Sequence, residues 1–117
     1  MMPILLVDDE AQVRRLIKTI LAGQGFEVVE AEDGLHAFST LQELQGELSL
    51  IVSDVQMPGL DGISLCKKVR KGFPHIPVLL YSGDTPEACR VGDRFLEKPL
   101  HLDALIGAVR DLVGDAL

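Results

Sequence analysis

Short apolar runs alternate along this chain with longer segments in which apolar residues recur every three or four positions. The runs lie near residues 4–7, 27–31, 48–53, 76–81 and 94–97. Such runs are typical of strands buried on both faces of a parallel sheet, whereas the longer spacing is typical of amphipathic helices. The alternation therefore predicts five βα units.

The predicted helices carry apolar stripes that we expect to face the core. The first helix should stop at Gly23 or Gly25, the second near Gly46, and the third should begin near Asp61 and Gly62. In chain order the stripes consist of Val13, Leu16, Ile17, Ile20 and Leu21; Leu35, Phe38, Leu41 and Leu44; Ile63, Cys66 and Val69; and Leu102, Leu105, Ile106, Val109, Leu112 and Val113. The pattern predicts an α/β fold in which helices cover both faces of the sheet.

Length and charge limit the function further. The length of 117 residues fits a single domain, residues 1–117, with its own hydrophobic core. The net charge of −7 opposes nonspecific attraction to nucleic acid or to an anionic membrane, so we expect neither as a direct partner. The start lacks the basic region of a signal peptide, and no apolar segment has the length of a membrane span.

Cys66 and Cys89 form no metal or redox motif, which favours free thiols in a cytoplasmic protein.

Polar residues follow four of the predicted strands at the point where each strand ends. Asp8 and Asp9 follow the first strand, Asp54 the third, Ser82 the fourth and Lys98 the fifth. The carboxyl ends of parallel strands meet at one sheet edge, so these side chains should converge. Two like charges about 4 Å apart repel by roughly 4 kcal/mol at an effective dielectric of 20, and a divalent cation relieves this repulsion. Oxygen ligands of this kind suit magnesium.

The same convergence suits phosphoryl transfer. The Asp54 carboxylate can attack a phosphoryl group and form a mixed anhydride while a metal ion neutralises the charge on the transferring oxygens. Lys98 supplies a positive charge, and the Ser82 hydroxyl can donate a hydrogen bond to a phosphoryl oxygen. Taken singly, acids and serines at strand ends are also common turn formers, so only the whole set indicates this chemistry.

The order and spacing of these residues resemble the receiver domain of bacterial two-component response regulators, among them the chemotaxis response regulators. The resemblance covers essentially the whole chain. Its motifs are Asp8-Asp9 after the first strand, Asp54 with residues 57–62 (MPGLDG) after the third, Ser82 after the fourth and Lys98-Pro99 after the fifth. It implies a doubly wound (βα)5 fold of the flavodoxin-like type, a five-stranded parallel sheet with strand order 2-1-3-4-5.

The resemblance also implies how a metal ion is held. Asp54 matches the phosphoacceptor and would bind Mg²⁺ or Mn²⁺ together with Asp9. Asp8 would assist through a water of hydration, and the backbone carbonyl of Gln56 would be a further ligand.

Three residues match the parts of a switch. Ser82 and Lys98 match the switch hydroxyl and the lysine that pairs with the phosphate, and Phe95 matches the aromatic switch position, which is tyrosine in many relatives. Phe95 has no hydroxyl to donate, and an aromatic residue in a strand also fits a plain core position. The peptide bond between Lys98 and Pro99 is expected to be cis.

The resemblance implies that a histidine kinase or a histidine phosphotransfer protein passes a phosphoryl group to Asp54, and that an output domain or a downstream protein reads the result. Between Ser82 and Lys98 the chain is several residues shorter than is usual in receivers, so we expect a fourth helix that is short or irregular. Partners would then use the first helix or the small residues of the last helix, namely Ala104, Gly107 and Ala108.

Other classes of function fit the residues less well. A receiver-like scaffold that binds proteins without being phosphorylated usually lacks an acid or the lysine, and this chain has them all. A phosphatase needs a second acid two residues beyond its nucleophile, where this chain has Gln56. Nucleotide binding needs a glycine-rich loop, and none follows the first strand. We therefore expect a phosphoacceptor signalling domain and not an enzyme.

Overall fold

The computed structural model describes residues 2–83 and 90–114. Within them, five parallel strands form one sheet in the order β2-β1-β3-β4-β5, which confirms the implied topology. The strands are β1 (Ile4–Val7), β2 (Val28–Ala31), β3 (Leu50–Asp54), β4 (Val78–Ser82) and β5 (Arg94–Glu97). Each lies within two residues of its predicted bounds, so the apolar runs predicted the strands correctly.

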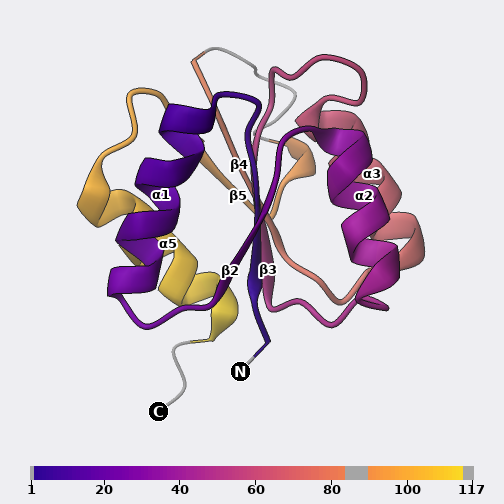
Figure 1. Cartoon of the computed structure of the whole chain (residues 1–117), viewed down its shortest axis with the longest axis horizontal. Helices are drawn as coiled ribbons and strands as arrows, with labels where there is room; N and C mark the ends of the chain where they lie inside the picture. The colour runs from indigo at the N-terminus through magenta and orange to yellow at the C-terminus, as the bar shows by residue number, and fades with distance from the viewer. Residues whose placement is uncertain (1, 84–89, 115–117) are drawn as a thin grey trace.

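The helices of the described residues flank the sheet on its two faces (Figure 1). α1 (Ala11–Gly23) and α5 (Leu102–Val113) cover one face, and α2 (Gly34–Glu43) and α3 (Gly62–Gly72) cover the other. Residues 84–89, which hold most of the predicted fourth helix, lie outside the described part of the chain. None of the helices described is long and apolar enough to cross a membrane.

Local sequence explains where two helices begin. The Asp33 carboxylate accepts the backbone N–H of His36, and the Asp61 carboxylate accepts that of Ser64, each at 2.8 Å. Such caps satisfy donors that the first turn of a helix leaves open. Ahead of the second cap, Gly59 has a φ of +74°, a backbone conformation that suits glycine.

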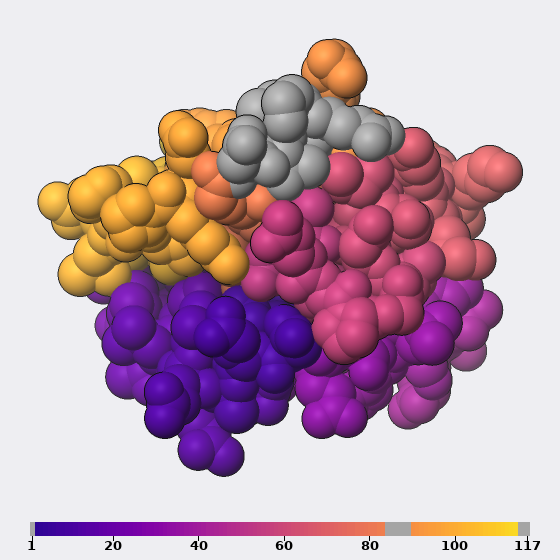
Figure 2. Space-filling model, turned by 90° about the horizontal axis from the view of Figure 1, so that it is seen from above, coloured from indigo at the N-terminus to yellow at the C-terminus, as the bar shows by residue number. Residues whose placement is uncertain are grey.

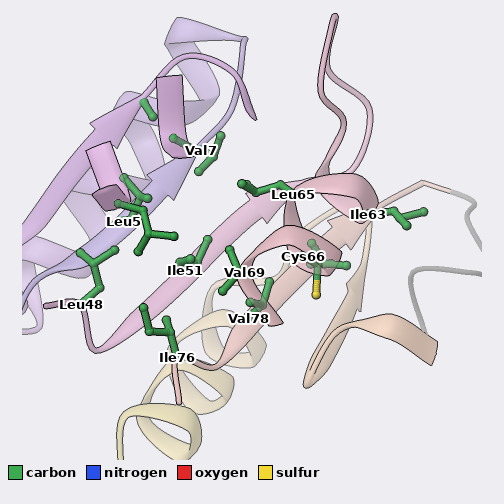
Figure 3. Packing of buried hydrophobic residues seen from close by; sticks show 14 of the residues in the cluster. Leu5, Val7, Leu48, Ile51, Ile63, Leu65, Cys66, Val69, Ile76 and Val78 are labelled. Carbon is green, nitrogen blue, oxygen red and sulfur yellow. The ribbon is translucent and has the colours of Figure 1, made fainter. Parts of the chain in front are cut away.

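The central strands are buried on both faces, which explains their continuous apolar runs. In β1, Leu5 and Val7 pack with residues of α2 and α3, whereas Ile4 and Leu6 pack with residues of α1 and α5. Figure 3 shows the first of these cores, where side chains of β1, β3, β4 and α3 fill the space between helix and sheet. The sheet therefore separates two cores.

Three leucines of the predicted stripes are exposed. Leu16 is 61% exposed, Leu35 64% and Leu102 51%, so the prediction that they belong to the core is wrong. In α1 the inward direction belongs to Ile17 and Leu21, one turn apart, and the residue before Ile17 is rotated away by roughly 100°. Leu35 and Leu102 lie in the first turns of their helices, next to the loops that follow the strands.

The small residues of α5 are also divided between surface and core. Ala104 and Gly107 are exposed, but Ala108 is fully buried among residues of the α1 and α5 core. Ala108 and Val109 follow the buried Leu105 by three and four positions, which completes one helical stripe. The prediction of an exposed small face is therefore wrong for Ala108.

Candidate functional site

The polar residues predicted to converge lie at the carboxyl edge of the sheet, which is at the top in Figure 1 and faces the viewer in Figure 2. The strand register brings them there. Asp54 of β3 lies opposite Tyr81 of β4, the neighbour of Ser82. Asp8 and Lys98 directly follow β1 and β5. Four strand ends therefore contribute to one site.

Three carboxylates meet at this edge. One oxygen each of Asp8, Glu10 and Asp54 lies within 4.8 Å of the others. Asp8 is 0% exposed and Asp54 2%, while Glu10 is exposed. Buried carboxylates this close repel one another, and carboxylate oxygens are the ligands that Mg²⁺ takes. The three acids can therefore hold a divalent metal ion.

Glu10 is a member of this cluster that sequence reasoning missed. The signal was present, since Glu10 directly follows Asp8 and Asp9 in a run of three acids. Asp9 is exposed and does not belong to the cluster found among the described residues, so its direct contact with a metal stays a prediction. For Gln56 the structure records a hydrogen bond from its N–H, and the metal-binding role of its carbonyl stays a prediction.

Asp54 is held through both carboxylate oxygens. Lys98 Nζ lies 3.2 Å from Oδ2, and the Gln56 N–H donates to Oδ1 at 3.4 Å. Burial raises the pKa of Asp54; the charge of Lys98 lowers it and that of Asp8 raises it, and the net change is upward. Additional positive charge at the cluster would favour the ionised form of the Asp54 carboxyl.

Ser82 and Lys98 lie side by side at the ends of neighbouring strands. Ser82 ends β4 and is 1% exposed, and its carbonyl accepts the Lys98 N–H at 2.9 Å. The peptide bond between Lys98 and Pro99 is cis, as predicted. The structure thus brings the predicted serine and lysine to the same edge as Asp54.

Phe95 lies farther from the acids, within β5 and opposite Leu80. Its ring is partly buried and packs against the core on the α2 and α3 face. This is the plain core position that the sequence also allowed. Its role as a switch stays a prediction.

Tyr81 is a second residue of the site that sequence reasoning missed. Its hydroxyl donates to Asp8 Oδ2 at 2.6 Å, and its ring centroid lies 5.5 Å from Lys98 Nζ. Burial raises the pKa of Tyr81, and the charge of Asp8 raises it further, so the phenol keeps its proton. The signal in the sequence was a tyrosine in an otherwise aliphatic run. A hydroxyl buried in such a strand needs a hydrogen-bond partner, which points to a polar neighbour.

Arg14 connects this edge to the neighbouring strand β2. Its Nη1 donates to the Asp8 carbonyl at 2.6 Å, and its Nε lies 3.0 Å from a Glu30 oxygen. Lys18 Nζ lies 3.1 Å from the other oxygen of Glu30. Burial alone would raise the pKa of Glu30, but the hydrogen bonds and charges of Lys18 and Arg14 lower it overall. The polar side of α1 therefore braces the backbone of Asp8.

A groove of about 450 Å³ lies between α1 and α5, beside the acids. Its lining includes the exposed Leu16 and Leu102 together with Glu10, Tyr81 and Lys98. Apolar surface is therefore continuous with the polar site on this face of the molecule.

The fold and the acidic edge together define a receiver-type signalling domain, in which acids cluster as they do at phosphorylation sites. The response regulator receiver domain family matches residues 4–110, and the chain belongs to this family. It is therefore a receiver domain of two-component signalling.

Three relatives illustrate the membership. The chain is 36% identical over 118 residues to the sensor kinase CckA of Brucella abortus (strain 2308), which covers 94% of this chain but only 12% of the kinase. It is 36% identical over 107 residues to the chemotaxis protein CheY-3 of Vibrio cholerae serotype O1, with 84% of this chain and 81% of CheY-3 covered. The crystal structure of the response regulator TrrA of Thermotoga maritima, in complex with Mg(2+)-BeF, is similar with a TM-score of 0.85 at 28% identity, covering 96% of this chain and 99% of TrrA.

Proposed function

We propose that Asp54 receives a phosphoryl group from a histidine kinase or a histidine phosphotransfer protein. The observation that carries this proposal is a buried carboxylate with Lys98 Nζ at 3.2 Å and with oxygens of Asp8 and Glu10 nearby. In the transfer, a bond forms between an Asp54 oxygen and phosphorus, while the bond between phosphorus and the donor's histidine nitrogen breaks. The leaving nitrogen keeps the electron pair of that bond.

The remaining residues stabilise the transferred group. A divalent ion, Mg²⁺ or Mn²⁺, would neutralise charge on the phosphoryl oxygens, and we assign its binding to Asp54, Asp9 and the Gln56 carbonyl, with Asp8 acting through water. The relative TrrA, which was solved with Mg(2+)-BeF, supports the binding of such an ion at this site. Lys98 would move from the carboxylate to a phosphoryl oxygen, because the phosphoryl group carries more negative charge.

The acyl phosphate would then act as a switch. The added charge draws the Ser82 hydroxyl and Lys98 toward Asp54, and Phe95 occupies the space that the serine leaves. An output domain or a downstream protein would read this change. On this proposal residues 1–117 are one signalling domain in the cytoplasm, which is modified once per cycle and does not turn over a substrate as an enzyme does.

We place the donor protein on the surface formed by α1 and α5. The groove between these helices opens beside Glu10 and Lys98, so a protein seated there can present a phosphohistidine to the acids. Leu16 and Leu102 are exposed on the same groove and supply apolar contact area. This placement retains the helices predicted from the sequence, although Ala108 does not belong to the exposed part.

Mass spectrometry of the intact protein tests the proposed function. The protein is incubated with acetyl phosphate, with and without Mg²⁺, beside Asp54→Asn and a control, Asp103→Asn, in which the exchanged acid is exposed and lies in the first turn of α5. We expect one added phosphoryl group, dependent on Mg²⁺, in the unaltered protein and in the control, and none in Asp54→Asn. Label that persists in Asp54→Asn would exclude Asp54 as the acceptor. No label from acetyl phosphate or from a phosphorylated histidine protein would favour the scaffold function.

A further inference from the structure

Tyr81 lies where the core and the acidic site meet. Alternate residues of a strand point to opposite faces, and the Tyr81 ring packs with the core on the α1 and α5 face, beside Leu79 of the same strand. The residue is 0% exposed. Its hydroxyl extends beyond this core to Asp8. One side chain therefore belongs both to the hydrophobic core and to the carboxyl edge.

Asp8 is oriented by two hydrogen bonds of different origin. The Glu10 N–H donates to Oδ1 at 2.8 Å, and the Tyr81 hydroxyl donates to Oδ2 at 2.6 Å. The first bond comes from the local turn after β1, but the second comes from a residue 73 positions away. With both oxygens engaged, the carboxylate has one defined rotation relative to Asp54.

The same aromatic ring contacts the lysine of the site. Lys98 Nζ lies 5.5 Å from the Tyr81 ring centroid and 3.2 Å from Asp54 Oδ2. An ammonium group at this distance from a ring is attracted by its negative face. Tyr81 thus contacts an acid of the cluster with its hydroxyl and the lysine with its ring.

We propose that Tyr81 is a positioning residue of the acidic site, which sets the orientation of Asp8 toward a bound metal ion and the place of Lys98 beside Asp54. This inference rests on the proposed function, because it concerns the same metal-assisted site. Side chains that orient the ligands of a metal ion change its affinity by roughly tenfold or more when they are replaced. Removal of the hydroxyl should therefore weaken Mg²⁺ binding although Tyr81 need not touch the ion.

Calorimetric titration with Mg²⁺ alone tests the inference. Tyr81→Phe keeps the ring and its contact with Lys98 but loses the bond to Asp8, and Leu79→Val serves as a control that perturbs the same core on the same strand. We expect Tyr81→Phe to bind Mg²⁺ roughly tenfold more weakly. Leu79→Val should lower the melting temperature and leave the Mg²⁺ affinity unchanged. Equal affinities for the unaltered protein and Tyr81→Phe would overturn the inference, and so would an equal loss in Leu79→Val.

An optical measurement on the unaltered protein makes the test independent of how well the variants fold. Tyr81 is the one tyrosine of the chain, which has no tryptophan, so tyrosine fluorescence reports on this side chain alone. A cation that binds near Asp8 polarises the Asp8 carboxylate, which accepts the hydrogen bond of the Tyr81 phenol. The fluorescence should therefore change on addition of Mg²⁺, with the midpoint found by calorimetry. Fluorescence that is constant while Mg²⁺ binds would overturn the inference.

The two proposals fail in different ways. If the unaltered protein binds no Mg²⁺, both the metal-assisted function and the role of Tyr81 are wrong. If the unaltered protein is phosphorylated on Asp54 in the presence of Mg²⁺ while Tyr81→Phe binds the ion with unchanged affinity, only the role of Tyr81 is wrong.

Discussion

The two faces of the sheet differ in what lies beneath their helices. Under α2 and α3 the buried cluster consists of apolar side chains and Cys66. Under α1 and α5 the core includes the ring of Tyr81, whose hydroxyl donates a hydrogen bond to Asp8, and a groove with exposed Leu16 opens beside it. One face therefore mainly provides stability, while the other connects the core to the acidic residues of the sheet edge.

The largest effect should come from the core under α2 and α3. Leu41 of α2 is fully buried, and Leu41→Ala should lower the free energy of unfolding by about 3 kcal/mol, because it removes apolar contacts and leaves a cavity. Urea unfolding measures this loss, with Leu21→Ala in the core of the other face as a comparison. Neither variant should change the Mg²⁺ affinity of the folded protein. A selective loss of Mg²⁺ binding in Leu41→Ala would show that the α2 and α3 face is not merely structural.

A tenfold effect is expected at the groove. Leu16→Glu should slow phosphoryl transfer from a phosphorylated histidine protein roughly tenfold, because it places a charge where the donor would pack. A tenfold change in rate corresponds to about 1.4 kcal/mol of activation free energy. Labelling by acetyl phosphate should be unchanged, since that small donor needs no docking surface. The matched control is Leu35→Glu on α2, where the replaced leucine is similarly exposed, at 64% against 61% for Leu16. Equal slowing in both variants would remove the distinction between the faces.

Asp54, where the two faces meet, should destabilise the folded protein at neutral pH. Its pKa is raised in the folded state, so the folded protein holds this proton more tightly than the unfolded chain, and stability falls as pH rises above the ordinary value of 3.8 and through the folded-state pKa. Without Mg²⁺, Asp54→Asn should be more stable at neutral pH by about 1 kcal/mol. In urea unfolding at a series of pH values, the difference should vanish in acid. A difference that grows as the pH falls would contradict this sign.

The smallest effect is expected at Glu30, whose ion pairs lie on the α1 side. Its pKa is lowered on folding, so it contributes stability above the ordinary value of 4.5, which is lost as pH falls through the folded-state pKa. Glu30→Gln should lower the free energy of unfolding by about 0.5 kcal/mol at neutral pH and low salt, and by less at high salt. Asp111→Asn, which breaks a more exposed pair with Arg94, should lower it by less still. Thermal unfolding of both variants measures the two losses. Equal losses would mean that burial of Glu30 has no effect.

Sequence alone predicted the strands and the position of Asp54 at the carboxyl edge of the sheet because these features depend on local pattern. The run that became β1 is apolar at every position, and β3 is apolar from Leu50 to Val52, since both faces of a central strand are covered. Asp54 ends β3 and Lys98 directly follows β5, and parallel topology then brings both to one edge, where Lys98 Nζ lies 3.2 Å from Asp54 Oδ2. The order of strands and polar residues along the chain was therefore sufficient to predict this part of the site.

Only the tertiary structure decided which neighbours these residues have. The bond from Tyr81 to Asp8 joins residues 73 positions apart, and it depends on strand register and side-chain direction, which no spacing encodes. The periodicity of α1 likewise includes Leu16, but the position of α5 across the groove leaves that residue exposed. A repeat of three or four residues defines a face only to within about 100° of helical rotation, so the border between core and surface is set by packing. Sequence therefore determined the elements and brought Asp54 and Lys98 to one edge, and packing determined how the side chains around Asp54 are oriented.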